Sequence, residues 1–330
     1  MPRFWWVNHN QTASQEIGGQ YLWSPKVERG GVRSQFYDNM REARPGDLVL
    51  SYASQAIRYV GPIAEFAIPS PKPLEFGTTG ANWSNDGWYL PVFWTPLGSP
   101  VRPKEIITDL RDLLPTKYSP LNARSGGGNQ KAYLAEIAPE VFDLVTAEAS
   151  FDRAALAQGG ANSLTFNIVT ENLEDGVEQW VQSDITLTDT ERRSVIQARR
   201  GQGKFRSNVE AVEQACRLTG VTNPTLLIAS HIKPWRVCAT AQERLDGMNG
   251  LLLTPDADLL FDRGFISFKD DGEALVSSRV EKADLRRLGF DQLAAERFGF
   301  EEAPAVWRTE SFAARQQGYL AYHRAQVFIS

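Results

Sequence analysis

Cysteine is scarce in this chain, with only Cys216 and Cys238 among 330 residues. Neither belongs to a CxxC pair, which excludes a zinc knuckle and leaves a reduced, cytoplasmic setting as the simplest expectation. Long apolar runs are missing too, so no membrane span is expected. The first residues, MPRFWWVNHNQTASQ, do not have the basic, apolar and small-residue regions of a secretory signal, so no leader is expected.

An excess of positive charge is also absent, because the formal net charge is −5. This excludes a protein coated in basic residues. It does not exclude nucleic-acid binding, since a local basic stripe is enough to contact phosphates. The chain is long enough for two domains, and 42% hydrophobic with 23% charged residues is typical of a globular protein.

The residue patterns divide the chain into three parts and predict an α+β fold class. Residues 1–148 alternate short β-type runs with helical segments and predict a small β-barrel with flanking helices. Residues 149–188 are polar and predict a linker that is partly helical. Residues 189–330 predict a second domain that begins and ends with helices.

Particular elements are expected within these parts. In the first part, the strand-like runs are 4–7, 47–53 and 57–68, and the helical segments are 34–47, 102–114 and 125–145. In the last part, Thr188 or Asp189 is suited to cap the first helix. LLIASHIKPW reads as a strand running into a loop, and NGLLLTPDADLLFDRGFISF as strand, turn, helix and strand.

Three polar residues of the last part follow one another in an order and at a spacing that indicate a catalytic site. His231 in SHIKPW is followed eighteen positions later by Asn249 in MNGLLL, and nine positions after that by Asp258 in TPDAD. A histidine can serve as a base near neutral pH, and a carboxylate is a hard oxygen ligand for magnesium or manganese. An asparagine can hydrogen-bond to an imidazole ring and fix its tautomer. These are the groups that hydrolysis of a phosphodiester needs.

Each of these residues has a plainer explanation when taken alone. A histidine after an apolar strand is usually a satisfied polar residue, Asn-Gly is usually a turn, and a lone aspartate can cap a helix. Their order within matching surroundings favours the catalytic interpretation. The other two histidines, His9 and His323, are expected to be structural.

The words ASHIKPW, NGLLL, LFDRGFISF, GQGKFR and YLAYHR resemble the HNH (ββα-metal) nucleases, in the subfamily found in many bacterial restriction enzymes, over residues 188–330. The resemblance implies a β-hairpin and a helix that hold one divalent metal ion, magnesium, manganese or another transition metal, against the scissile phosphate. It implies that His231 is the general base, that Asn249 orients it, and that Asp258 binds the metal.

The chain departs from the family pattern at one position. Many members carry an acidic metal ligand just before the first histidine, where this chain has Ser230. Asp262 lies four residues after Asp258, on the same face of the expected helix, and is the candidate for a second metal ligand. Ser230, Asp258 and Asp262 are therefore the predicted metal site.

Basic residues precede the expected hairpin, and only Glu191 opposes them over 190–206. Such a run is most often a solvated helix face, but beside a nuclease motif it favours phosphate contacts that position DNA without identifying its sequence. Lys233 and Arg236, next to His231, are further candidates. The residues of the run are Arg192, Arg193, Arg199, Arg200, Lys204 and Arg206.

The first part resembles the EVE domain of the PUA-like superfamily, which includes the YTH and SRA modified-base readers, over residues 1–148. The resemblance rests on FWWVNHN, PGDLVLSY, RYVGPIAEF and GNQKAYLAEI. It implies a domain that flips one nucleotide out of the stack into an aromatic pocket. Such a pocket needs flat walls and groups that recognise the base edge, and burying one methyl carbon adds about 0.8 kcal/mol.

Candidates for this pocket come from three stretches of the first part. Trp83 is favoured because it lies in a polar stretch that no core strand would carry, whereas Trp5 and Trp6 are expected in the core. The candidate walls are Trp23, Pro25, Trp83 and Tyr133. The candidate edge-recognising residues are Ser24, Asn82, Ser84 and Asp86.

Together the two resemblances predict a modification-dependent, type IV-like restriction endonuclease. Its partner would be double-stranded DNA that carries 5-methyl- or 5-hydroxymethylcytosine, and two chains acting as a homodimer, or successive nicks, would cut both strands. Two alternatives stay open. One is a nicking or repair-type HNH nuclease that recognises RNA or a damaged base, and the other is a non-catalytic reader, which the Ser230 departure alone supports.

Overall fold

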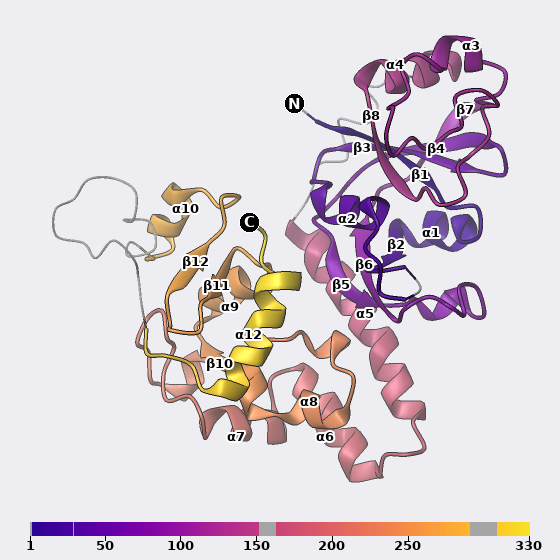
Figure 1. The fold of residues 1–330 in the computed structure, drawn as a ribbon. Helices are drawn as coiled ribbons and strands as arrows, with labels where there is room; N and C mark the ends of the chain where they lie inside the picture. The colour runs from indigo at the N-terminus through magenta and orange to yellow at the C-terminus, as the bar shows by residue number, and fades with distance from the viewer. Residues whose placement is uncertain (1, 29, 152–162, 291–308) are drawn as a thin grey trace. The chain divides into compact units, whose positions relative to one another are not determined.

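The structure is a computed structural model that describes residues 2–28, 30–151, 163–290 and 309–330. The chain divides into two compact units, Met1–Leu173 and Glu174–Ser330. Each unit combines helices with β-sheets (Figure 1), so the predicted α+β class is confirmed. The division falls within helix α5 (Ser163–Ser183), inside the predicted linker. Among the described helices, none has the length and apolar character to cross a membrane.

A five-stranded sheet forms the centre of the first unit, in the order β7-β4-β3-β1-β8. Strands β1 and β3 are parallel, and the other neighbours are antiparallel. Trp5 and Trp6 point to opposite faces of β1 and both are fully buried, which confirms that they belong to the core. The strands are β1 (Phe4–Asn8), β3 (Leu48–Ala53), β4 (Ala56–Pro62), β7 (Thr95–Val101) and β8 (Leu134–Ile137).

A second sheet of three antiparallel strands, in the order β2-β6-β5, completes this unit. A bridge between Ile63 and Val92 links the ends of the two sheets. The strands are β2 (Tyr21–Pro25), β5 (Ile68–Pro71) and β6 (Asp86–Pro91). The helices are α1 (Ala13–Gly19), α2 (Gln35–Glu42), η1 (Leu74–Phe76), α3 (Ile107–Leu110) and α4 (Pro139–Glu148).

Two expected helices of this unit are corrected. Over 102–114 only Ile107–Leu110 is helical, since Pro103 and Pro115 confine the segment. Over 125–145 the first part is not a helix, because Leu134–Ile137 pairs with β1 and completes the edge of the sheet. The helix starts only at Pro139, a residue suited to the first turn. Tertiary pairing overrides the helix propensity of the Lys-Ala-Tyr-Leu-Ala-Glu stretch.

The second unit begins as the sequence predicts. Thr188 caps α6 (Asp189–Arg199), and its hydroxyl and the Glu191 carboxylate form a capping box. The helices that follow are α7 (Gly203–Glu210), η3 (Pro224–Leu226), η4 (Trp235–Val237), α8 (Ala241–Leu245), η5 (Gly247–Asn249), α9 (Pro255–Asp262), α10 (Lys282–Arg287) and α12 (Ala314–Gln326). The strands are β9 (Ile228–His231), β10 (Gly250–Leu253), β11 (Ile266–Phe268) and β12 (Ala274–Val276).

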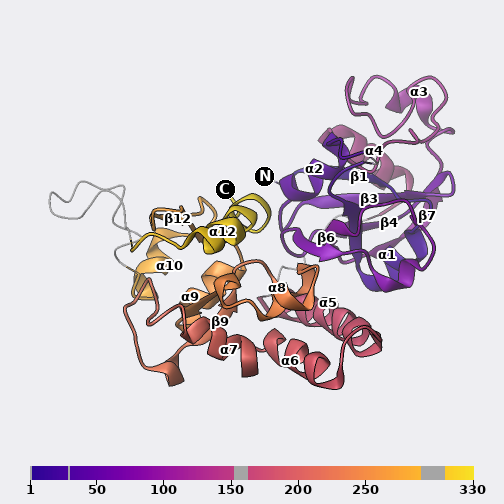
Figure 2. The ribbon, with the colours of Figure 1, turned by 60° about the horizontal axis from the view of Figure 1, so that its bottom comes forward.

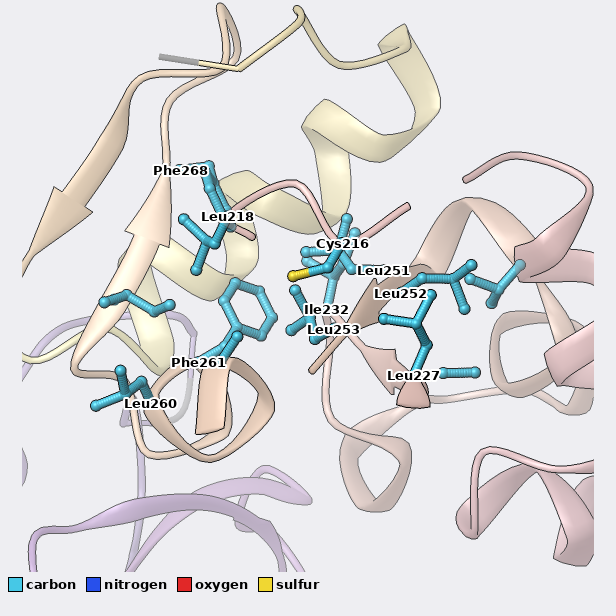
Figure 3. Close-up of a cluster of buried hydrophobic side chains, with 14 of the residues drawn as sticks. Cys216, Leu218, Leu227, Ile232, Leu251, Leu252, Leu253, Leu260, Phe261 and Phe268 are labelled. Atoms are coloured by element: carbon cyan, nitrogen blue, oxygen red, sulfur yellow. The ribbon is translucent and has the colours of Figure 1, made fainter. Parts of the chain in front are cut away.

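Strands β9 and β10 form an antiparallel pair that leads directly into α9, which gives a ββα unit. Apolar side chains from all three elements meet in one core, where Ile232 and Leu251 lie close to Phe261 (Figure 3). Helix α12 contacts η5 and β11 and closes this core through Leu320. It is the yellow helix of the second unit in Figures 1 and 2. Helices α7 and α9 thus pack against the strand pair in which His231 ends β9.

Candidate active site and base-binding site

His231 is the last residue of β9, and its ring has a defined hydrogen bond. Its Nε2 lies 3.0 Å from the backbone oxygen of Arg244. A carbonyl oxygen only accepts, so Nε2 carries the hydrogen and Nδ1 keeps a lone pair. Burial lowers the pKa of His231 to about 4. The ring is therefore neutral at physiological pH and can accept a proton at Nδ1.

Asn249 contacts the loop after His231 rather than the imidazole ring. Its Oδ1 accepts from the backbone nitrogen of Lys233 at 2.8 Å. Its Nδ2 lies 3.2 Å from the backbone oxygens of both Lys233 and Glu243. The prediction that Asn249 fixes the tautomer directly is thus corrected. The Arg244 carbonyl fixes the tautomer instead. Asn249 acts one residue before it, because its buried amide hydrogen-bonds to Glu243 and to Lys233 and so joins the two ends of the segment between them.

Ser230, Asp258 and Asp262, the three predicted metal ligands, come together on β9 and α9. The Ser230 hydroxyl donates to the Asp258 carboxylate, and the charge of Asp262 acts on the same group. Burial, with a smaller contribution from Asp262, raises the pKa of Asp258 to about 6. Burial and like charge both disfavour ionisation of a carboxylate, which accounts for this direction.

The donor set suits a hard cation but is small. Within the described ranges, no three His, Cys, Asp or Glu side chains are grouped so as to hold a metal ion. The site thus offers two carboxylates and one hydroxyl, all oxygen donors, as magnesium and manganese prefer. Remaining positions around such an ion would be filled by water and phosphate oxygens.

Two predicted phosphate contacts, Arg199 and Arg236, are corrected. Three carboxylates of α5 surround Arg199, with Glu174, Asp175 and Glu178 at 3.0, 2.6 and 2.8 Å. Arg236 is 3% exposed and lies 3.8 Å from Glu174. Both arginines therefore bind the part of α5 that belongs to the second unit.

Two further candidates are also engaged within the fold. Arg206 binds Glu210 at 2.8 Å and donates to the backbone oxygens of Leu227 and Pro224. The Lys233 ammonium pairs with Glu243 at 3.0 Å. Arg206 therefore fastens α7 to the segment that leads into β9. Among the charged run, Arg193, Arg200 and Lys204 have exposed side chains and remain candidates for phosphate contact.

In the first unit, the structure brings Trp23 and Trp83 together. Their rings are nearly parallel, with centroids 6.3 Å apart and planes at 26°. Phe76, which sequence reasoning missed, packs edge-on against both tryptophans. Trp23 is only 1% exposed, whereas Trp83 is partly exposed. Trp83 is thus the ring of this cluster that a ligand can reach first.

Two glycines leave the space that these tryptophans occupy. A Cβ at Gly80 would fall 2.1 Å from the Trp83 ring, and one at Gly87 would fall 2.2 Å from the Trp23 ring. Gly80 also has a φ of +65°, a conformation that favours glycine. In the sequence both look like ordinary loop or strand glycines, because only the folded chain shows which ring lies over them.

Polar groups beside the tryptophans differ in whether they have a hydrogen-bond partner among the described residues. The Trp23 Nε1 and the Ser24 hydroxyl are buried and, within the described residues, have no hydrogen-bond partner. An unpaired buried donor costs about 1–3 kcal/mol, so a group that pairs with it stabilises the fold. Of the other predicted pocket residues, Pro25 is buried, Asn82 is exposed, and Asp86 pairs with Lys26 at 2.7 Å.

Tyr133 is bound to β2 by a hydrogen bond. Its hydroxyl donates to Glu16 Oε1 at 2.7 Å and accepts from the backbone nitrogen of Trp23 at 3.0 Å. The other Glu16 oxygen pairs with His9, which also contacts the Ser51 hydroxyl. His9 is therefore structural, as expected. Tyr133 holds the strand that carries Trp23, and its role as a pocket wall stays a prediction.

The comparison with protein families gives a match within the second unit. Residues 216–269 match the family model of an HNH endonuclease. The match contains β9, β10, α9 and β11, and with them His231, Asn249 and Asp258. The second unit thus carries an HNH endonuclease domain. A search of curated proteins gives no match.

Several solved structures are similar to about half of the chain. A protein from Rhodopseudomonas palustris is 16% identical, with 45% of this chain and 93% of that chain covered and a TM-score of 0.31. Human THYN1 in complex with 5-methylcytosine-containing DNA is 14% identical, with 46% and 99% covered and a TM-score of 0.29. The YTH domain of Zygosaccharomyces rouxii MRB1, in complex with N6-methyladenosine RNA, is 10% identical, with 46% and 89% covered and a TM-score of 0.30.

Proposed function

We propose that this protein is a modification-dependent DNA endonuclease of the type IV-like restriction class. Its first unit would hold a flipped cytosine with a 5-methyl or 5-hydroxymethyl group, and its second unit would hydrolyse a nearby phosphodiester. One observation carries the catalytic part of the proposal. His231, within the HNH match, is neutral and bonded through Nε2 to Arg244, so its Nδ1 has a lone pair for a proton.

In the proposed reaction, His231 Nδ1 takes a proton from the water that attacks phosphorus. The Nε2–H bond to the Arg244 carbonyl strengthens as the ring becomes charged, which stabilises the imidazolium without moving it. The bond between phosphorus and the leaving oxygen then breaks. Asn249 keeps the Arg244 carbonyl in place by holding Glu243, the residue before it.

We assign a divalent cation, magnesium or manganese, to Asp258 and Asp262, with Ser230 orienting the Asp258 carboxylate. A cation there would relieve the repulsion and the desolvation that raise the pKa of Asp258 to about 6. When bound, it would stabilise negative charge on the phosphate and on the leaving oxygen. Consecutive residues of β9, Ser230 and His231, would then serve the metal and the base.

For the base-binding part, the support is the cluster around Trp83. Stacking of one base on an aromatic side chain contributes about 1–3 kcal/mol, and Trp83 offers an accessible ring. The Trp23 Nε1 and the Ser24 hydroxyl, which have no hydrogen-bond partner among the residues that the structure describes, could pair with polar atoms of a flipped base. Asp86 and Asn82 lie at the start of the neighbouring strand and in the loop before it.

Binding in the presence of a chelator tests this part without cleavage. Anisotropy would compare duplexes with 5-methylcytosine, 5-hydroxymethylcytosine or unmodified cytosine, together with RNA. Trp83→Ala is expected to lower the preference for modified DNA about tenfold or more, as loss of one stacked base predicts. Trp180→Ala, at a 49% exposed tryptophan of α5, is the matched control and should leave the preference unchanged. Unchanged preference in Trp83→Ala would refute this pocket.

The two alternatives predict other outcomes in the same experiments. Tighter binding of RNA, or of a duplex with a damaged base, would favour a nicking or repair-type HNH nuclease. Binding of modified DNA with no metal-dependent cleavage would favour a non-catalytic reader. Metal-dependent cleavage that His231→Ala abolishes would exclude that reader.

A further inference from the structure

The imidazole of His231 lies flat on the phenyl ring of Phe205. The ring centroids are 3.7 Å apart and the planes are within 3° of parallel. Phe205 comes from α7 and is fully buried. Such a contact restricts rotation of the imidazole, because turning the ring would drive one edge into the phenyl face. The stack thus sets the plane of the ring, and the bond to Arg244 sets its direction within that plane.

Gly250 provides the room for this phenyl ring. It lies opposite His231 in the hairpin, and a Cβ there would fall 3.0 Å from Phe205 Cζ and 2.3 Å from Val209 Cγ2. Its backbone is extended, with φ −141° and ψ 156°, which any residue adopts. The glycine of the Asn-Gly pair is therefore required for space and not for a turn. Asn249 and Gly250 serve two different supports of the same imidazole.

The segment that carries Phe205 is itself fixed against β9. Gly201 has a φ of +60°, and a Cβ there would fall 2.4 Å from the backbone oxygen of Ala229. On the other side of Phe205, Arg206 donates to the backbone oxygen of Leu227 at 2.8 Å. The GQGKFR word therefore brings α7 close to the strand, places the phenyl ring and fastens the helix.

We propose that Phe205 is a positioning residue for the His231 base, and that Gly250 leaves the space that the side chains of Val209 and Phe205 occupy. The proposal rests on the proposed function, since it takes His231 to be the general base. Phe205 itself touches neither substrate nor metal. It acts by keeping the Nδ1 lone pair in one direction, and it covers one face of the ring against water.

Cleavage kinetics of Phe205→Leu give the first test. Leucine keeps an apolar side chain but has no flat face, so the imidazole can turn. We expect kcat on DNA to fall about tenfold to a hundredfold with KM unchanged, as for loss of alignment rather than of binding. Phe268→Leu removes another fully buried phenylalanine of the same unit and is the matched control. It should lower the melting temperature similarly and keep kcat within about twofold.

Proton NMR of the histidine rings tests the stack without any cleavage. The chain has only three histidines, so His231→Ala assigns the signals of His231. In the wild-type protein these signals should lie upfield of their unfolded positions, because the ring faces a phenyl group. Phe205→Leu should remove that shift for His231 and leave the signals of His323 in place. A wild-type spectrum in which the assigned His231 signals lack the shift would overturn the proposal.

The remaining outcomes separate this proposal from the function on which it rests. If Phe205→Leu loses the shift but keeps the kcat of Phe268→Leu, while His231→Ala is inactive, Phe205 is only a core residue and the proposed function stands. If His231→Ala cleaves normally, the general-base assignment itself fails. If Phe205→Leu does not fold, Phe205→Met keeps more of the apolar contact and supports the same comparison.

Discussion

Two histidines of the second unit are each stacked on a phenylalanine ring, but they differ in how many of their ring nitrogens form hydrogen bonds. His231 lies on Phe205 at 3.7 Å, and His323 lies on Phe261 at 3.9 Å. His323 uses both nitrogens, one toward the Ser267 hydroxyl and the other toward the backbone oxygen of Phe261. His231 uses only Nε2, toward Arg244, among the hydrogen bonds of the described residues. An aromatic support therefore does not distinguish the proposed general base from a structural histidine, whereas the available lone pair of His231 does.

The largest expected effect separates these two histidines directly. His231→Ala should reduce DNA cleavage by about a hundredfold to ten-thousandfold, the usual contribution of general-base catalysis. His323→Ala should leave kcat unchanged and lower the free energy of unfolding by about 1–3 kcal/mol, because it leaves buried polar groups unpaired. Single-turnover cleavage and thermal unfolding of both variants measure this. Equal loss of cleavage in the two variants would remove the distinction.

The metal site gives the next largest effect. Asp258→Asn should abolish any rise in melting temperature that manganese or magnesium produces, and should reduce cleavage strongly. Without metal the variant should be more stable by about 1–2 kcal/mol, because it removes a buried carboxylate that Asp262 repels. Asp256→Asn, at an exposed residue of the same helix, is the control and should change neither property. An unchanged metal response in Asp258→Asn would exclude Asp258 as a ligand.

The basic residues of the run over 192–206 should likewise divide into residues that bind DNA and residues that stabilise the fold. Replacing Arg200 and Lys204 with alanine should weaken binding to all DNA sequences equally and lower the salt dependence by about one unit per charge. Folding should be unaffected, since both side chains are exposed. Arg199→Ala should instead lower the melting temperature, because it removes a cation that pairs with three carboxylates of α5. Salt titrations of binding and thermal unfolding would check both. A change of salt dependence in Arg199→Ala at constant stability would contradict the structural role.

The smallest effect concerns pH. Burial lowers the pKa of His323 to about 3, so the folded protein keeps this ring neutral while the unfolded chain protonates it below about pH 6.5. The unfolded state then binds more protons, and the free energy of unfolding falls as the pH falls. The contribution of His323 is at most about 1.4 kcal/mol per pH unit. Denaturant unfolding at pH 7 and pH 5 should show a smaller difference for His323→Asn than for the wild-type protein. An equal difference would show that His323 does not titrate in this way.

Much of the second unit could be predicted from its sequence because the signals there are local. The Thr188 cap, the hairpin strands and the helix with Asp258 follow from residues within a few positions of one another. The order of His231, Asn249 and Asp258 is likewise visible along the chain. What they would do there remains a prediction until the variants are measured.

The side chains that position these residues could not be predicted, because they come from parts of the sequence far from the residues that they contact. Phe205 reaches His231 across 26 positions, and the role of Gly250 is visible only once the phenyl ring lies over it. Arg199 looks like a phosphate contact until α5 brings three carboxylates to it. In the first unit, Leu134–Ile137 becomes a strand only because β1 has an edge to fill.

The most direct test of the central claim is cleavage of one plasmid in two forms, unmodified and cytosine-5-methylated, with magnesium or manganese and with a chelator. A nuclease governed by a modified-base sensor should cut the methylated form alone and lose this activity in the chelator. A 5-hydroxymethylated plasmid would show which of the two modifications is preferred. Equal cutting of modified and unmodified forms would contradict the sensor, and metal-independent cutting would contradict the assigned metal site.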